Sequence, residues 1–314
     1  MSKIFLSGFG AVSPGGWGVE PLLGALTGAW PAAQALERPG WTRPLAVRRV
    51  PAPNPRPAWA AQARMRRAAA ISQFAMGAAA EALAGQSDGP LGIVYCTMCG
   101  CVNYSRRFYD EVLREPATAS PLLFPETVFN APASHLSAVL AAPAINYTLV
   151  GDTGIFLHGL ALAAGWIESG RVENCLVVAA EEVDWITADA LRHFQKSAQL
   201  GEGAGAVLLT RARTAHTCAA LECVTDPEPF GPRGGRAARG DARRRVTAAL
   251  PANSAVNVGS EPFGEAFSVG AAWQVLAAIR AAQTQARARA TVLVPGAYQE
   301  AIGASFTMIS ATDL

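Results

Sequence analysis

Short runs of uninterrupted apolar residues alternate along the chain with longer stretches in which apolar residues recur every three or four positions. The short runs are bounded by glycine, proline or polar residues, and they predict buried strands. The longer stretches predict helices. We expect strands at 3–7, 91–96, 144–150, 174–183, 205–211, 219–224, 290–296 and 305–310, and helices at 68–85, 126–142 (broken or restarted near Pro132), 155–170 and 270–286.

Strands that are apolar on both faces need helices on both sides, so this alternation predicts an α/β fold of layered sheets and helices. The irregular rhythm of the elements argues against a barrel. The strand–helix pattern weakens after Arg213, which indicates two related halves, 1–212 and a shortened 213–314. The glycine-rich segment GFGAVSPGGWG at 8–18 is expected to be a loop.

The composition points to an apolar surface as well as a large core. Hydrophobic residues make up 51% of the chain and charged residues 16%, whereas an average protein has about 25% charged residues. Little charge is therefore available to cover the surface, and we expect an obligate oligomer with an extensive apolar interface. The net charge of +2 does not favour general nucleic-acid binding.

One segment departs from this balance. Residues 232–245, PRGGRAARGDARRR, carry a single acid, Asp241, and many arginines. The segment is either a solvated, mobile loop or a docking patch for an acidic partner or a phosphate. The arginines are Arg233, Arg236, Arg239, Arg243, Arg244 and Arg245.

The six cysteines are not spaced like a secreted disulfide framework. The N-terminus lacks the organisation of a signal peptide, and no apolar run reaches about 18 residues, so we expect a cytoplasmic protein with no membrane span. Cys96, Cys99 and Cys101 form a CxxCxC cluster that could bind a metal ion, but no second Cys/His pair lies nearby at zinc-like spacing. We interpret the cluster as a buried turn leading into a polar loop, and expect no metal and no cofactor.

Several stretches, in order, resemble the β-ketoacyl synthase family, which has the thiolase fold. The most specific is LGEGAGAVLLTR at 200–211, a turn entering the strand that closes the first half. In the stretch LVGDTGIFLHGL at 149–160, a strand runs through a sharp turn into a helix, as at the nucleophile elbow of the family. The other matching stretches are 6–18, 64–84, the block 124–182 that contains Asn130, His135, His158 and Glu182, and, more weakly, 265–279 and 290–309.

The resemblance implies chemistry that this sequence lacks. The family uses a thiolate at a helix N-terminus, two histidines and a lysine, but the nucleophile position carries Thr153 and the second-histidine position carries Phe267. The lysine position falls near Pro262, and PGAYQEAIG at 295–303 replaces the family's glycine-rich closing loop. The four histidines are His135, His158, His193 and His216, and none lies in a His-Gly-Thr-like stretch.

The neighbours of Thr153 allow more than one interpretation. Asp152 is expected to cap the elbow helix, with a catalytic role or a contact across a dimer interface as alternatives; its carboxylate would repel a malonyl carboxylate. His158 and His135 are interpreted as satisfied structural histidines. Four apolar residues either pack in the core or line an acyl tunnel near the subunit interface: Leu123, Phe124, Phe129 and Phe156.

Within the family, these losses resemble the chain-length factor, or β-subunit. Such a subunit pairs with an active ketosynthase, shapes the far end of its acyl tunnel and works with an acyl carrier protein. The short chain is similar to factors of bacterial aryl-polyene-like type II pathways. Two alternatives stay open: an acyltransferase or hydrolase that uses Thr153 or a cysteine such as Cys99, and a non-catalytic homodimer that binds an acyl chain or a carrier protein.

Overall fold

The computed structural model describes residues 3–84, 90–142, 145–195, 199–231, 235–251 and 264–309. The strands are β1 Ile4–Ser13, β2 Gly16–Trp17, β3 Gln34–Leu36, β4 Leu45–Arg48, β5 Leu91–Thr97, β6 Asn146–Val150, β7 Asn174–Glu181, β8 Leu200–Gly201, β9 Gly203–Thr210, β10 Ala219–Val224, β11 Glu228–Pro229, β12 Arg289–Val294 and β13 Glu300–Met308. The helices are α1 Val19–Thr27, α2 Ala70–Ala82, α3 Val102–Arg114, α4 Ala131–Val139, α5 Ile155–Glu168, α6 Trp185–Phe194, α7 Arg236–Ala249 and α8 Phe267–Thr284, with short 3-10 turns at Ala58–Ala61, Pro116–Thr118 and Phe124–Glu126.

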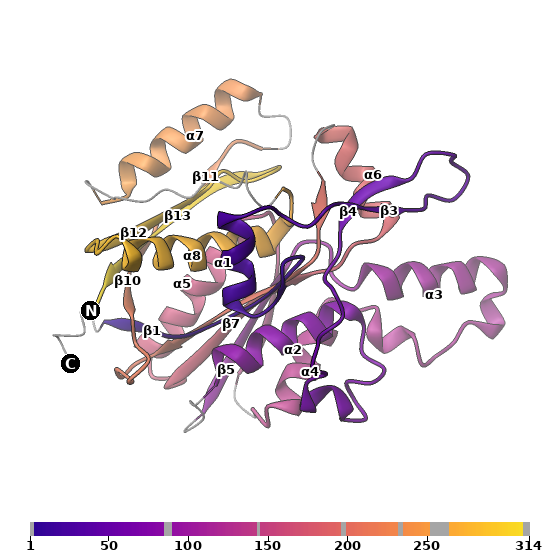
Figure 1. Ribbon diagram of the computed structural model, residues 1–314, viewed down its shortest axis with the longest axis horizontal. Helices are drawn as coiled ribbons and strands as arrows, with labels where there is room; N and C mark the ends of the chain where they lie inside the picture. The colour runs from indigo at the N-terminus through magenta and orange to yellow at the C-terminus, as the bar shows by residue number, and fades with distance from the viewer. Residues whose placement is uncertain are drawn as a thin grey trace.

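A single curled sheet of ten strands forms the frame of the molecule (Figure 1). Its strand order is β11-β13-β10-β1-β9-β7-β5-β6, with β12 paired to β13 and β2 to β1. β5, β6 and β7 run parallel to one another, whereas β9 is antiparallel to both β7 and β1. β1 also pairs with β10, and so joins the parallel strands to the C-terminal strands. A second, small sheet has the order β3-β4-β8.

Side-chain alternation along β7 shows how the sheet is covered. Leu176, Val178 and Ala180 pack in the cluster that contains α2 and α4, while Val177 and Ala179 pack in the cluster that contains α5 and α8. α8 also packs on β12 and β13, and α7 packs on the outer side of these strands. Helices and sheet segments therefore alternate in five layers, and α5 and α8 form the buried central layer.

The structure confirms the predicted α/β architecture. The predicted strand at 91–96 is β5, that at 174–183 is β7, and the predicted helix at 155–170 is α5. The expected break near Pro132 is the start of α4. The division into 1–212 and 213–314 remains a prediction.

Other predictions were wrong. Residues 8–13 of the predicted loop continue β1, because this segment pairs with β9 as far as Val12. β6 is not buried, because it forms the edge of the sheet and its side chains are exposed or half-buried. The polar loop expected after Cys101 is α3, and residues 236–245 of the expected arginine loop belong to α7.

Glycine sets how closely α5 approaches the sheet. A Cβ atom at Gly159 would lie 2.7 Å from the Cys96 sulfur on β5 and 2.9 Å from a Val177 methyl on β7, whereas a Cβ at Gly165, in the same helix, would meet nothing within 4 Å. The first glycine is required by packing, and the second is exposed.

These two positions make a matched test of the packing. Gly159→Ala should lower the free energy of unfolding by about 1–3 kcal/mol, because the methyl group overpacks the layer between α5 and the sheet. Gly165→Ala should raise it by about 0.5–1 kcal/mol through its higher helix propensity. Urea unfolding of both variants measures the difference, and equal stabilisation by both would contradict the described packing.

Candidate functional site

The elbow lies where β6 ends and α5 begins. The Gly151 N–H donates to the Thr97 carbonyl at the end of β5 (3.3 Å), and the Ile155 N–H donates to the Asp152 carbonyl (2.9 Å). The sequence folds this way because an apolar strand meets a turn with glycine at both ends, Gly151 and Gly154, before an apolar helix. Asp152 and Thr153 are thereby held at the start of a buried helix, with exposed fractions of 6% and 8%.

Asp152 binds the loop that precedes β13. Its Oδ2 accepts from the backbone N–H groups of Ala297 (3.2 Å), Tyr298 (3.0 Å) and Gln299 (2.8 Å). Its Oδ1 accepts from the N–H groups of Thr153 (2.8 Å) and Ala297 (3.1 Å). We call these four N–H groups, of Thr153, Ala297, Tyr298 and Gln299, the amide cradle.

The expectation that Asp152 caps the elbow helix was wrong in its main point. The N-cap residue of α5 is Gly154, and no side chain caps the helix. The Asp152 carboxylate takes one N–H from the elbow and its other hydrogen bonds from the closing loop, because the glycine at 296 turns that loop toward it. Gly296 has φ of +68°, and a Cβ there would lie 1.7 Å from the Glu300 carbonyl.

Thr153 has no activating base. Within the described residues its hydroxyl has no hydrogen-bond partner, whereas an alcohol nucleophile requires an adjacent base. His158, one turn further along α5, is half-buried, and its Nε2 lies 2.5 Å from Oε1 of Glu300. This pairing fits the structural role expected for His158.

Phe267 begins α8 and is buried. It packs with Val183, Leu191 and Leu200, and its φ is +48°, a conformation that bulky residues rarely adopt. An apolar ring thus lies at the position predicted to correspond to the second histidine. The position near Pro262 lies outside the described residues.

Glu181, at the end of β7, is a buried carboxylate that sequence reasoning missed. It accepts from the N–H groups of Met98 (2.5 Å) and Cys99 (3.1 Å) and from the Ser268 hydroxyl (2.5 Å). Burial raises the pKa of Glu181 to about 7, and these hydrogen bonds oppose the shift. The only sequence signal was a pair of glutamates, Glu181 and Glu182, at the end of an apolar strand.

Two further buried carboxylates, Glu182 and Glu202, lie in stretches that matched the family, but the sequence did not reveal what they bind. Glu182 accepts from the N–H groups of Ile71 (3.3 Å) and Asn103 (2.9 Å). Glu202 accepts from the N–H groups of Val183 (3.0 Å) and Val50 (3.2 Å). Burial raises the pKa of both carboxyls, and both bind backbone N–H groups of loops or element ends, which indicates a structural role.

The cysteines are poor nucleophiles. All six are free thiols. Burial raises the pKa of Cys99, the cysteine next to Glu181, and raises the pKa values of Cys175 and Cys218 to about 12. In the described part of the chain, no group of three or more His, Cys, Asp or Glu side chains could hold a metal ion.

The four residues predicted to line a tunnel or an interface are not equivalent. Phe156 is fully buried in the central layer, and Leu123 is 8% exposed, whereas Phe124 and Phe129 are 56% and 45% exposed. The ring of Phe129 lies over Gly100, where an added Cβ would come within 2.4 Å of it. The ring of Phe124 packs at a tilt against Phe108 of α3, with ring centroids 5.6 Å apart.

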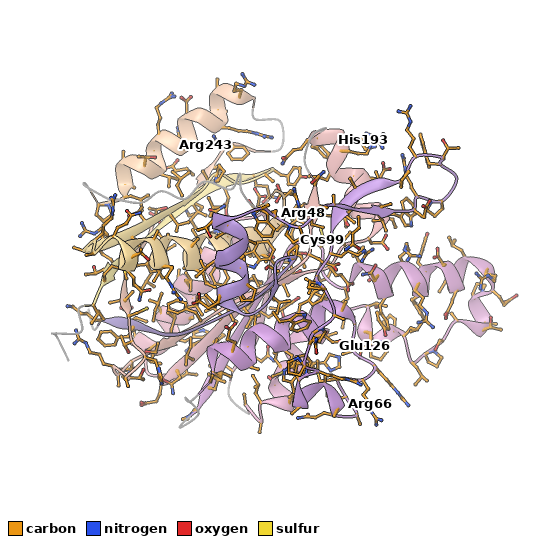
Figure 2. All side chains as sticks on the ribbon, in the orientation of Figure 1. Arg48, Arg66, Cys99, Glu126, His193 and Arg243 are labelled. Carbon is orange, nitrogen blue, oxygen red and sulfur yellow. The ribbon has the colours of Figure 1, made fainter. Side chains whose placement is uncertain are left out.

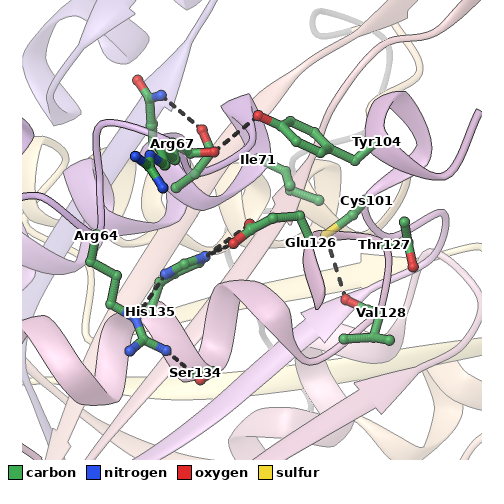
Figure 3. Close-up of polar contacts among 12 residues, drawn as sticks. Arg64, Arg67, Ile71, Cys101, Tyr104, Glu126, Thr127, Val128, Ser134 and His135 are labelled. Carbon is green, nitrogen blue, oxygen red and sulfur yellow. Dashed lines mark hydrogen bonds and ion pairs between the residues drawn. The ribbon is translucent and has the colours of Figure 1, made fainter. Parts of the chain in front are cut away.

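His135 lies on α4 in a hydrogen-bonded network that fits its expected structural role (Figure 3). The Arg64 Nε–H donates to His135 Nδ1 (3.0 Å), so the other ring nitrogen, Nε2, carries a proton and donates to Glu126 (2.9 Å). Another Arg64 nitrogen donates to the Ser134 hydroxyl (3.0 Å).

The arginines of α7 lie apart from the elbow on the outer layer (Figures 1 and 2). Figure 2 labels Arg243 on α7 and Cys99 near the middle of the molecule. Arg244 and Arg245 form ion pairs with Asp241 and Glu228. Arg239 lies over the Phe230 ring, 5.3 Å from its centroid. Arg236 is exposed, and Arg233 lies outside the described residues.

Comparisons with known proteins agree with this geometry. The family model for 3-oxoacyl-[acyl-carrier-protein] synthase III matches residues 153–227. The solved structure of the ishigamide ketosynthase/chain length factor aligns with a TM-score of 0.80 at 20% identity, covering 98% of this chain and 100% of that chain. A β-ketoacyl synthase from Burkholderia phymatum aligns with a TM-score of 0.77 at 15% identity, covering 99% and 100%. No curated protein matches the sequence.

A third solved structure is a type II polyketide synthase acyl carrier protein in complex with its ketosynthase. It aligns with a TM-score of 0.75 at 16% identity, covering 98% of this chain and 99% of that chain. The fold of the chain is therefore the thiolase-type fold of the β-ketoacyl synthases, as the motif resemblance predicted. No helix in the described residues is long and apolar enough to cross a membrane.

The raised pKa of Glu181 predicts a specific pH dependence. Between pH of about 4.5 and 7 the folded protein retains a proton on Glu181 that the unfolded chain has lost, so this group makes folding less favourable as pH rises. Relative to Glu181→Gln, the wild type should lose up to about 1.4 kcal/mol of unfolding free energy per pH unit across this window. Urea unfolding from pH 4.5 to 8 measures the difference.

Glu222 provides the control of opposite sign. Its hydrogen bond with Arg289 lowers the pKa of the Glu222 carboxyl, so its contribution to stability is present above pH 4.5 and is lost as the pH falls below that value. With the urea series extended below pH 4.5, the wild type should therefore lose stability relative to Glu222→Gln as the pH falls, the opposite direction to Glu181. A stability difference for Glu181→Gln that does not change with pH would contradict the assignment.

Proposed function

We propose that the chain is a chain-length-factor type of ketosynthase-like subunit, which does not condense acyl chains itself and pairs with an active ketosynthase. The observation that carries the proposal is the elbow, where the ketosynthase fold is kept without its chemistry. Thr153 stands at the predicted nucleophile position, and its hydroxyl has no hydrogen-bond partner in the described part of the chain. The adjacent Asp152 carboxylate accepts hydrogen bonds from the surrounding backbone N–H groups.

The exposed apolar edge of the sheet supports a partner subunit. β6 is the last strand of the sheet, and Tyr147 and Val150 on it are 54% and 51% exposed. An edge strand with unpaired backbone groups and exposed apolar side chains is a template for pairing with another chain. Further large apolar side chains are exposed at Leu122, Phe124, Val128 and Phe129.

The proposed pathway and carrier-protein partner rest on the resemblance and on the charge of α7. Two of the similar solved structures are of a ketosynthase/chain length factor, and a third is a ketosynthase with its acyl carrier protein. For this chain we propose a cytoplasmic role in a type II polyene pathway of the aryl-polyene kind, with an acyl carrier protein as a further partner. The exposed arginines of α7 are the proposed docking surface for this acidic protein.

Thr153→Ala tests the loss of chemistry. The chain is co-expressed with candidate ketosynthases from the same genome, and the purified complex is examined by native mass spectrometry. We expect a 1:1 complex and the same rate of product formation with wild type and Thr153→Ala, because the partner supplies the nucleophile. A homodimer that binds none of the ketosynthases would contradict the proposed pairing. A large loss of rate in Thr153→Ala would instead support the acyltransferase or hydrolase alternative.

Tyr147→Lys tests the proposed interface. A lysine on an edge strand disfavours strand pairing with another chain, and loss of a buried aromatic anchor typically weakens a complex by about tenfold or more. Affinity for the ketosynthase should fall while the unfolding midpoint of the isolated chain stays near that of the wild type. Ile186→Lys on α6, where the isoleucine is 42% exposed, is the matched control and should bind normally.

A further inference from the structure

The amide cradle has the properties of an anion-binding site. Three successive backbone N–H groups, of Ala297, Tyr298 and Gln299, and the N–H of Thr153 all donate to one carboxylate. Successive N–H groups that converge in this way form a concavity that favours anions. The left-handed backbone at Gly296 bends the loop so that all three face the elbow.

The charge of Asp152 is compensated by backbone groups. The side chain is 6% exposed, and all its hydrogen-bond partners among the described residues are backbone N–H groups. No arginine, lysine or histidine of the described residues forms a salt bridge with it. A buried carboxylate is costly unless it is fully hydrogen-bonded. The N–H groups of the cradle therefore replace the hydrogen bonds that water donates to an exposed carboxylate.

We propose that the amide cradle is a carboxylate-binding site that the chain fills with its own Asp152, and that a small free monocarboxylate such as acetate or formate occupies it once that side chain is shortened. Asp152 acts as an internal ligand and holds the site closed. While it does so, the N–H of Thr153 is unavailable to an oxygen of any molecule bound at the elbow.

The group bound in the amide cradle matters because the loop that carries the cradle contacts two helices. The Tyr298 ring packs edge-to-face on Phe194 of α6, with centroids 5.3 Å apart, and Glu300, directly after the cradle, pairs with His158 of α5. The group in the cradle therefore fixes a loop that contacts both α5 and α6. Without an occupant, the N–H groups of residues 297–299 would lose their acceptor and the loop would open to solvent.

Asp152→Ala is the first test, with sodium acetate and sodium formate as probes and sodium chloride at equal ionic strength as the reference. In Asp152→Ala, acetate should raise the unfolding midpoint by about 2 °C at a concentration about tenfold above its dissociation constant. Acetate should also slow hydrogen exchange at residues 297–299. The wild type should show neither effect, because its cradle is full.

Two further variants keep the test decisive. Asp152→Asn retains a side chain of the same size that still fills the cradle, and acetate should give it no specific gain. Asp110→Ala removes a half-exposed aspartate of α3 and should respond to acetate as the wild type does. If Asp152→Ala does not fold in chloride, its refolding yield in acetate replaces the midpoint, and recovery only in acetate or formate supports the proposal.

An equal response of Asp152→Ala to acetate and chloride would overturn the proposal, as would equal stabilisation of the wild type and Asp152→Ala by acetate. The same holds if the exchange of residues 297–299 is identical in the wild type and in acetate-free Asp152→Ala. The site is tested on the isolated chain and involves no ketosynthase. Its failure would therefore leave the proposed pairing untouched, and failure of the pairing would leave the cradle intact.

Discussion

The hydrogen bonds between Asp152 and the closing loop connect the two parts of the fold. Residue 152 lies between β6 and α5, and residues 297–299 lie between β12 and β13. These segments are far apart in sequence and in sheet order, yet one carboxylate joins them through the three N–H groups of residues 297–299. The arrangement requires a glycine at 296 and an uncapped start of α5, so several local features depend on this single contact.

Side chains near the elbow make packing and hydrogen-bond contacts that hold neighbouring segments in place. Phe267 packs against Val183 and Leu200, and Glu181 holds the turn after β5 through the N–H groups of Met98 and Cys99. Each buried carboxylate around the elbow binds backbone N–H groups, so its charge is used to fix the path of the chain. The apolar layers of α5 and α8 need no nucleophile, and the fold survives without one.

Helices and strands could be predicted from the sequence where their form depends on the residues of their own segment. The strand β7 and the helix α5 were predictable because their apolar residues recur with a period that matches the element. α7 was not, because most of its residues are polar and only Ala242, Val246 and Leu250 anchor this segment to the sheet. The character of β6 was also missed, because an apolar run does not reveal whether a strand has one neighbour or two.

The same distinction applies to the candidate site: features within one segment could be predicted, and contacts between distant segments could not. The turn at the elbow could be predicted, since Thr153 and its neighbours lie in one local motif. The partners of Asp152 and Glu181 could not, because they are backbone N–H groups, which every non-proline residue carries and which leave no trace in the sequence. A short acidic side chain at a helix start predicts a local cap, and only the fold brings residues 297–299 within its reach.

The exposed edge and the elbow are coupled through the chain itself. Val150, 51% exposed at the end of β6, directly precedes Gly151, whose N–H is bound to the Thr97 carbonyl. A chain that paired with β6 along its whole length would therefore reach the residue next to the elbow turn. Phe129 completes the exposed surface because Gly100, in the turn after β5, leaves room for its ring outside the core. Tyr147 and Val150 are the large apolar residues that β6 itself exposes, and others are exposed on α3, on α6 and in the segment 122–129.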